Sequence, residues 1–379
     1  MNNKEDREYV IQGFGLNRSQ VDGEHTFFYD ESVNIRKFAI EDSTKYNNQI
    51  EQDFVLGGLM VERQTCQELP NVKDVVQSLG MQKTQKEIKC KNIAQGPFLD
   101  SIKSKKLGIF LSWIEQSGLW VHFRSCNYFY YGLVDIIDDC RDGNGAGVNA
   151  EFREVAKNAL WKAFCFSENQ GAALLYRFSY PNVGVEQAAE FYRAICEFYH
   201  NADYLDAKEI ACLDKFCASA DGEKCVFLAN NTPLQIQERF TEFYLEPLML
   251  FCNSTHWLDE EVYVKQDFEK FSVASPDFQS IRHEFLKSES NLSVQMSDVM
   301  VGIIGKLFQY TNKICSIEQL DSDLKGMTIE QHRNFRLLAS LILRSMDEFP
   351  ALVNRVQADS MKESFECCLR YVQNQKEPA

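Results

Sequence analysis

Residues 25–32 read His-Thr-Phe-Phe-Tyr-Asp-Glu-Ser, a β-rich run that ends in acids. Aromatic and β-branched residues in this pattern predict a strand. Residues 54–61 read Phe-Val-Leu-Gly-Gly-Leu-Met-Val, a nearly continuous apolar run that predicts a second strand. Such runs are typical of a sheet covered on both faces. Because side chains alternate along a strand, only one of Asp30 and Glu31 can point into a given site.

The segments around these two strands alternate between helical and extended patterns. We expect a loose arm over residues 1–24 and a charged loop over 33–52. Beyond the glycines of 143–147, the sequence pattern predicts mainly helices to about residue 240. The order of elements predicts a mixed α/β architecture. Helices are expected over 67–80, 97–117, 293–313, 328–347 and 350–373, and further strands over 119–126, 248–252 and 257–260.

Composition narrows the class of protein. The chain has 379 residues, 45% of them hydrophobic and 25% charged, which excludes a wholly disordered or fibrous protein. A net charge of −15 excludes a protein that is basic throughout, such as a histone-like protein. Nucleic acid binding stays open, because it requires only a locally basic groove. Residues 83–106 hold seven lysines against two acids and predict such a patch; a solvated helix face is the alternative.

The 13 cysteines are scattered, odd in number and mostly set among apolar neighbours. With a polar first segment, they predict reduced, buried thiols in a cytoplasmic protein without a secretory signal. No apolar run approaches about 18 residues, so no membrane span is expected. A phosphate-binding GxxxxGK[ST] motif is absent, which disfavours a nucleoside triphosphatase. A zinc site could be formed by His200, Cys212, Cys217 and Cys225. These residues lack the CxxC spacing of structural zinc sites, so a zinc site is disfavoured.

Several acids stand where carboxylates could converge. Asp30 ends a strand, Glu87 stands beside Lys89, and Asp298 follows Gln295 by three residues on an apolar helix, so that these two share a face. An acid on an apolar helix is costly unless it is paired or binds metal. The ordinary alternatives are a solvated strand end, an exposed turn and a helix cap. Two further acidic runs, 259–261 and 135–139, could each supply one more ligand.

Four motifs in order resemble the domain-of-unknown-function family 3800. They are Tyr-Asp-Glu-Ser at 29–32, Phe-Val-Leu-Gly-Gly-Leu at 54–59, Glu-Ile-Lys at 87–89 and Gln-Met-Ser-Asp at 295–298. The resemblance covers about 25–140 and 245–310. It departs from the family pattern at Val33, where the family has glycine, and at Met296-Ser297, where it has Leu-Ala. The central-strand acid is less clear; Asp259 is the best match and Asp135 the reserve.

The resemblance implies an RNase H-like mixed sheet flanked by helices and a metal-dependent nuclease, often found in bacterial antiphage or mobile-element contexts. The core would span 25–140 and 245–313, with a mainly helical insertion at 141–244 and C-terminal helices at 314–379. It implies Asp30, Glu87, Asp259 and Asp298 as catalytic ligands of Mg²⁺ or Mn²⁺. Lys89, Lys91 and Gln295 would contact the substrate, RNA or DNA.

A second interpretation belongs to another class of protein. The chain could be a non-catalytic interaction or sensor protein that retains the RNase H-like fold. The helical insertion carries aromatic pairs at 191–192 and 198–199, which predict either core packing or a face for a protein partner. Association with further copies of the chain is also open. Convergence of the four carboxylates favours the enzyme, and their separation favours the interaction protein.

Overall fold

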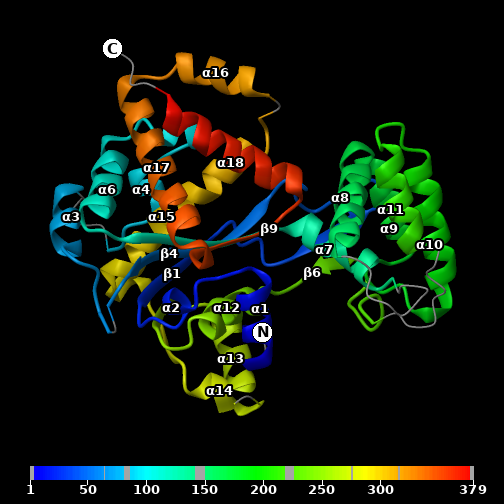
Figure 1. Cartoon of the computed structure of the whole chain (residues 1–379), viewed down its shortest axis with the longest axis horizontal. Coiled ribbons are helices and arrows are strands. Elements are labelled where there is room, and N and C mark those ends of the chain that lie inside the picture. The colour runs from blue at the N-terminus through cyan, green and yellow to red at the C-terminus, as the bar shows by residue number, and fades with distance from the viewer. Residues whose placement is uncertain are drawn as a thin grey trace.

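The computed structural model describes residues 4–63, 65–80, 86–140, 150–217, 226–274, 276–314 and 316–375. Its centre is a mixed six-stranded sheet flanked by helices, which confirms the predicted α/β class (Figure 1). The strand order is β8-β7-β1-β4-β5-β9. These strands are β1 (Thr26–Ser32), β4 (Asp53–Val61), β5 (Trp120–Asn127), β7 (Thr255–Asp259), β8 (Arg282–Leu286) and β9 (Val353–Val356).

Strand β1 lies inside the sheet, between β4 and β7. It pairs antiparallel with β4, with Asp30 opposite Gly57, and β4 pairs antiparallel with β5. In the other direction β1 pairs parallel with β7, and β7 pairs parallel with β8. The C-terminal ends of β1 and β7 therefore lie side by side. The last residues of these two strands include Asp30 and Asp259.

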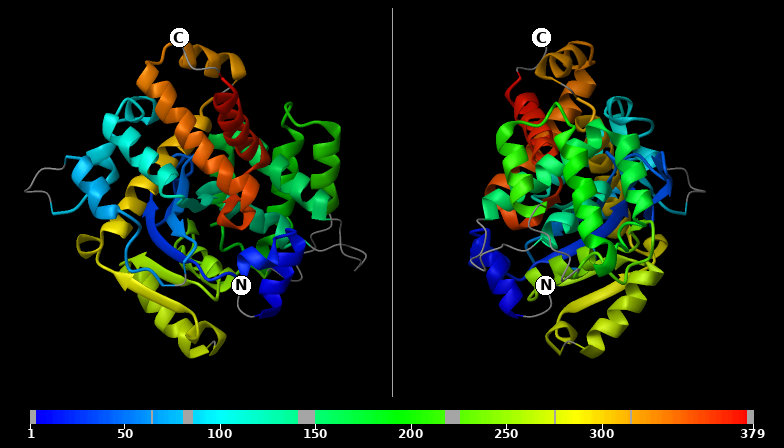
Figure 2. Two further views of the ribbon diagram at one scale, coloured as in Figure 1. Left: turned by 60° about the vertical axis from the view of Figure 1, so that its left-hand side comes forward. Right: turned by 90° about the vertical axis from the view of Figure 1, so that its right-hand side faces the viewer.

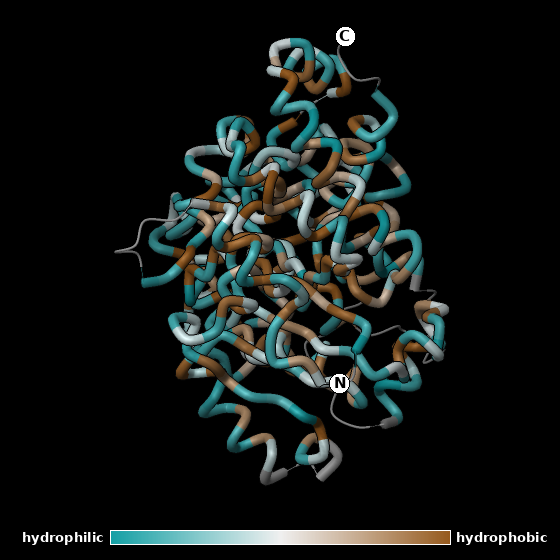
Figure 3. Tube along the Cα trace, turned by 90° about the vertical axis from the view of Figure 1, so that its left-hand side faces the viewer, coloured by the Kyte–Doolittle hydropathy of each residue, from teal (hydrophilic) through white to brown (hydrophobic). Residues whose placement is uncertain are grey.

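Side chains of β1 alternate between two hydrophobic cores, one on each face of the sheet. Phe27 and Tyr29 belong to one core, and Phe28 belongs to the other. The tube in Figure 3 shows the hydrophobic segments gathered in the interior. The same alternation directs Asp30 to the face of Phe28 and Glu31 to the face of Tyr29. The prediction that these two acids point to different places is confirmed by their contacts, described below.

Helix α15 (Leu292–Thr311) crosses β1 and β4 on the Phe28 face. Asn291 caps its first turn, accepting hydrogen bonds from the backbone N–H groups of Ser293 and Val294. Ser297 Oγ donates to Phe28 O at 2.9 Å and accepts from Leu59 N at 3.3 Å. A Cβ at Gly58 would lie 2.4 Å from Ser297 Oγ and 2.3 Å from Phe28 O. Glycine at this position of the sheet therefore permits the helix to approach it closely.

Other helices complete the cover of this face. Helix α6 (Lys105–Gln116) and the C-terminal helices α17 (Ile329–Glu348) and α18 (Asp359–Asn374) contribute side chains to the same core as α15. Phe365 of α18 stacks on Phe308 of α15, with ring centroids 4.4 Å apart. Shorter helices complete this layer: α3 (Val72–Ser78), α4 (Cys90–Ile93), α5 (Phe98–Ser101) and α16 (Ile317–Lys325).

The predicted insertion is mainly helical in its described part and stands beside the sheet (Figures 1 and 2). Helix α7 (Tyr128–Asp138) leads out of β5 and packs on α8. A small sheet joins the insertion to the core, with the order β3-β2-β6. The remaining elements here are α8 (Ala150–Phe166), α9 (Glu168–Arg177), α10 (Val185–His200), α11 (Ala207–Cys217), β2 (Phe38–Asp42), β3 (Lys45–Tyr46) and β6 (Gln235–Gln237).

Four segments differ from the sequence predictions. The expected loose arm contains helices α1 (Lys4–Gly13) and α2 (Arg18–Val21), and Arg7 Nε donates to Leu250 O at 2.9 Å. The expected loop at 33–52 contains β2 and β3. The strand expected at 248–252 is wrong, because residues 248–250 end helix α12 (Thr241–Leu250). The C-terminal segment, expected to be helical, also supplies the edge strand β9.

Helices α13 (Val262–Ala274) and α14 (Pro276–Gln279) follow β7 and precede β8. None of the helices in the described ranges has the length and apolar character needed to cross a membrane. The cysteines that can be described are all free thiols; Cys225 and Cys315 lie outside the described residues.

Candidate functional site

The end of β1 sends its two acids to opposite faces of the sheet. Asp30 is 5% exposed and lies on the face covered by α15. Glu31 lies on the other face, where Tyr244 Oη donates a hydrogen bond to its Oε2 at 3.1 Å. The strand therefore places one carboxylate under α15 and the next beside α12.

Asp30 is the most deeply buried acid of the site. Its Oδ1 accepts a hydrogen bond from the backbone N–H of Glu31 at 2.7 Å. Its Oδ2 is buried and has no hydrogen-bond partner among the described residues. Burial raises the pKa of Asp30 well above its usual range, and the negative charges of Glu31, Asp298 and Asp259 raise it further. A buried carboxylate oxygen without a donor is costly, and a proton, a water molecule or a cation can satisfy it.

Asp298 reaches the site from α15 and is held by the start of α4. Its Oδ1 accepts a hydrogen bond from Cys90 N at 2.9 Å. Lys89 Nζ lies 3.5 Å from Asp298 Oδ2 and 2.8 Å from Glu87 Oε1. Burial alone would lower the pKa of Lys89, but Glu87, Asp30 and Asp298 raise it. Lys89 is therefore a charged ammonium set among three carboxylates.

Asp259, at the end of β7, completes the group through Ser288. The backbone N–H of Ser288 donates to Asp259 Oδ1 at 3.1 Å, and Ser288 Oγ donates to Glu87 Oε1. Burial raises the pKa of Asp259. Although burial opposes it, the hydrogen bonds of Lys89 and Ser288 lower the pKa of Glu87. Lys89 and Ser288 thus connect Asp298, Glu87 and Asp259 into one chain of contacts, which does not include Asp30.

We call Asp30, Glu87, Asp259 and Asp298, together with Lys89, the carboxylate cluster. The fold places Glu87 and Asp298 in contact with Lys89, and Glu87 and Asp259 in contact with Ser288; Asp30 interacts with Asp298, Asp259 and Lys89 through charge, as it does with Glu31. Ser288 was missed. It lies in the short polar link between β8 and α15, and this position, just before the helix that carries Asp298, was the only signal available.

Gln295 lies behind the cluster and is 2% exposed. Its Oε1 accepts from Ile88 N at 2.9 Å, and its Nε2 donates to Ser288 O at 2.7 Å. It therefore joins the segment of Glu87 and Lys89 to that of Ser288. The geometry supports a positioning role, whereas the sequence predicted a contact with the substrate. Lys91, on α4, is exposed beside the cluster.

The acids of the 135–139 run lie away from the cluster, and two of them have structural partners of their own. Asp138 forms ion pairs with Lys157 and Arg153. Asp139 accepts backbone hydrogen bonds from residues 226–228. Burial, and then the charges of Asp138 and Asp139, raise the pKa of Asp135 to about 7. Among the two candidates for the central-strand acid, Asp259 is the one whose charge acts on Asp30.

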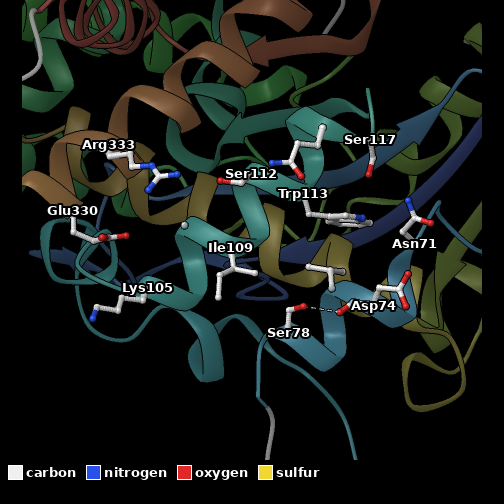
Figure 4. A pocket seen from close by; sticks show the side chains of 13 residues that line it. Asn71, Asp74, Ser78, Lys105, Ile109, Ser112, Trp113, Ser117, Glu330 and Arg333 are labelled. Carbon is white, nitrogen blue, oxygen red and sulfur yellow. Dashed lines mark hydrogen bonds between the residues drawn. The ribbon is translucent and has the colours of Figure 1, made fainter.

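The predicted basic patch of 83–106 is divided by the fold. Lys83 lies outside the described residues, and Lys103 pairs with Asp100. Lys105 borders a hollow of about 730 Å³ formed by α3, α6 and α17, away from the carboxylate cluster. Figure 4 shows Lys105, Glu330 and Arg333 on one side of this hollow. Among the described lysines of the patch, Lys89 pairs with Glu87 and Asp298, and the charge of Lys91 acts on Glu87.

Within the described ranges, no group of three or more His, Cys, Asp or Glu side chains is close enough to hold a metal ion as it stands. In the carboxylate cluster, Lys89 and Ser288 occupy the space between the acids. Of the residues considered for a zinc site, His200 contacts Asp214, with Nε2 2.7 Å from Oδ1. Cys225 is not among the described residues.

Comparisons of the chain with models of protein families, with curated proteins and with solved structures found no match.

Proposed function

We propose that the chain is a divalent-metal-dependent nuclease built on an RNase H-like core. One observation carries the proposal: Asp30, on an inner strand, has a buried oxygen without a partner, and Asp298 and Asp259 are close enough to raise its pKa. The order of the sheet supports it too, because parallel β1 and β7 end together and α15 crosses above them.

The donor set fits a hard divalent cation. All four acids offer carboxylate oxygens, the ligands that Mg²⁺ and Mn²⁺ prefer. Four carboxylates face one ammonium, so the cluster carries excess negative charge that a divalent ion would offset. Asp30, Asp259 and Asp298 would hold the metal, with Glu87 joining them once Lys89 and Ser288 release it. A bound metal supplies an activated water and stabilises the leaving oxygen of a phosphodiester.

The residues of the chain have separate tasks in this proposal. Lys89 is the charged group nearest the acids, and it would exchange its contact with Glu87 for a non-bridging phosphate oxygen. Gln295 fixes Ile88 and Ser288, and thereby holds Glu87 and Asp259 in place. The unpaired oxygen of Asp30 has no hydrogen-bond donor that a cation would have to displace.

The test is cleavage of single-stranded, duplex and hybrid substrates by the purified chain with Mg²⁺, Mn²⁺ or EDTA. We expect cleavage with metal, and a loss of at least about 100-fold in Asp30→Asn and Asp298→Asn. The control is Glu186→Gln, which alters an exposed acid of α10 on the insertion. Wild type that cuts nothing with either metal, or Asp30→Asn that cuts as well as wild type, would refute the proposal.

One observation favours the alternative of a non-catalytic sensor or interaction protein. Lys89 and Ser288 already bind the acids to one another, so the cluster can also be a purely structural ion-pair network. Calorimetric titration with Mn²⁺ separates the two. Binding that disappears in Asp30→Asn supports the nuclease, and its absence from wild type supports the alternative.

A further inference from the structure

A cavity lies on the Glu31 face of β1, the face opposite to that of Asp30 and α15. Its volume is about 560 Å³, and it is lined by the loop after β1, the start of α12 and the start of α13. Tyr244 lines this cavity and donates a hydrogen bond to Glu31. Glu261 also lines it, and its charge acts on Glu31. No residue of the carboxylate cluster lines the cavity; the two are linked through Glu31, whose charge acts on Asp30 and which is itself affected by the charge of Asp259.

Three cations and two acids line this cavity, and one of the cations, Arg239, is paired with Asp267. Arg36, Lys37 and Arg239 line it, against Glu238 and Glu261. Arg36 and Lys37 are exposed and form no ion pair within the described part of the chain. In a chain with a net charge of −15, two available cations beside an acidic site indicate a site for an anionic ligand.

The position of the cations is fixed by the surrounding backbone and side chains. Asn34 Oδ1 accepts from Arg36 N at 3.0 Å, and Tyr128 Oη accepts from Ile35 N at 3.2 Å. On the opposite wall, Arg239 Nη1 lies 3.2 Å from Asp267 Oδ1, while its side chain remains 54% exposed. These contacts hold the cations at the cavity without burying them.

An aromatic ring completes the surface. Tyr263 lines the cavity and is 54% exposed, which leaves a face of its ring free for contact. Cations that follow a phosphate backbone and an aromatic side chain that stacks on a base are the two components of single-strand recognition. The volume lies in the range of about 300–1,000 Å³ that encloses a ligand of moderate size.

We propose that this cavity binds a single-stranded segment of nucleic acid next to the scissile phosphate. Arg36 and Lys37 contact phosphates of this segment, and Tyr263 stacks on one of its bases. The inference rests on the proposed nuclease function and adds to it a substrate class, single strands, and a binding surface distinct from the carboxylate cluster.

The test is binding of fluorescent 12-nucleotide single strands, RNA and DNA in separate arms, measured by anisotropy in EDTA. We expect the double variant Arg36→Ala/Lys37→Ala to weaken binding at least tenfold. Its slope of log K against log salt should fall by about 1.4, the value for two lost phosphate contacts on a single strand. The matched control, Arg193→Ala/Lys208→Ala, removes two exposed cations from the insertion and should leave binding unchanged.

A second variant tests the aromatic contact independently of charge. Tyr263→Ala should weaken binding about fivefold or more, and Tyr263→Phe should restore it, because the ring face is retained. Binding of the Arg36→Ala/Lys37→Ala variant within twofold of wild type would overturn the inference. Equal loss in the control pair, or a duplex bound as tightly as a single strand, would overturn it as well.

These results separate the two proposals. Strands that bind through the cavity but are never cut with Mn²⁺ contradict the nuclease function and leave the binding surface standing. Cleavage by wild type that survives Arg36→Ala/Lys37→Ala, with unchanged binding, contradicts the binding surface and leaves the nuclease function standing.

Discussion

Asp30 combines burial, negative charge and an oxygen without a hydrogen-bond donor, a combination that costs stability. An amide at this position would keep an acceptor for Glu31 N and offer a donor to the neighbouring acids. We therefore expect Asp30→Asn to increase the free energy of unfolding by about 1–2 kcal/mol at pH 7.5 in EDTA. Urea unfolding measures this change.

The same substitution should abolish the stabilisation that Mn²⁺ gives to wild type, since ligand binding stabilises by mass action. Glu186→Gln serves as the control and should change the free energy of unfolding by less than about 0.5 kcal/mol. A destabilised Asp30→Asn protein would mean that the carboxylate is satisfied in the folded state.

Asp135 provides a pH-dependent prediction away from the cluster. Burial, and then Asp138 and Asp139, raise its pKa to about 7, above the value of about 3.9 in an unfolded chain. The folded state then binds more protons between these values, so the contribution of Asp135 to stability is lost as pH rises through about 7. We expect Asp135→Asn to gain about 1–3 kcal/mol over wild type on going from pH 4 to pH 8.

Unfolding curves of Asp135→Asn and wild type at several pH values measure this difference. The Glu186→Gln control, which removes an exposed acid, should show a difference from wild type that is nearly independent of pH. A pH-independent difference for Asp135→Asn as well would show that Asp135 is ionised at low cost in the folded state.

At the scale of elements, the contact between α15 and β4 determines whether Asp298 reaches the sheet. A Cβ at Gly58 would lie 2.3 Å from Phe28 O and 2.4 Å from Ser297 Oγ. We expect Gly58→Ala to destabilise the chain by about 3 kcal/mol or more, because α15 would have to move away from the strand. It should also lower cleavage, because Asp298 moves with α15.

Gly13→Ala is the matched control for this prediction. Gly13 ends α1, and a Cβ there meets no atom within 4 Å. Its unfolding free energy should stay within about 0.5 kcal/mol of wild type. If Gly58→Ala proved as stable as Gly13→Ala, the close approach of the helix and the sheet would be incorrect.

The sequence predicted elements best where a pattern was long or alternating. Residues 54–61 and the apolar helix after Asn291 matched their predictions because burial on both faces leaves a continuous apolar run. The strand expected at 248–252 was wrong because a short apolar run does not distinguish a strand from a buried helix. Strand β9 was missed, since its four residues are only partly buried.

The sequence identified the acids of the candidate site. It did not identify the hydrogen bonds and ion pairs that those acids form. Acids at the ends of parallel strands and on the helix above them meet for topological reasons. The pairing of Lys89 with Glu87 and Asp298, and the link through Ser288, depend on how α4 and the segment before α15 pack together. The resemblance implied that Gln295 contacts the substrate; a shared helix face with Asp298 does not show which backbone groups the Gln295 side chain meets.

At the scale of the molecule, the C-terminal helices belong to the same hydrophobic core as the sheet. Phe365 of α18 is fully buried and packs against Phe123 of β5 and Phe308 of α15. We expect Phe365→Ala to cost about 3–5 kcal/mol in the free energy of unfolding. Phe152→Ala, which alters a ring on α8 that is 40% exposed, should cost much less.

Urea unfolding monitored by tryptophan fluorescence and by circular dichroism tests this prediction. Loss of stability with coincident transitions would show that the sheet and α18 unfold together. An unaffected main transition in Phe365→Ala would mean that the C-terminal helices unfold separately.

The pairing of β9 with β5 has a consequence for synthesis of the protein. Strand β5 ends at Asn127, and its edge partner begins at Val353, about 225 residues later. At roughly 5–20 residues per second, a ribosome takes on the order of ten to forty seconds to make that interval. During it the open edge of β5 can pair with another nascent chain. Chaperone demand during translation should therefore be highest before β9 emerges from the ribosome.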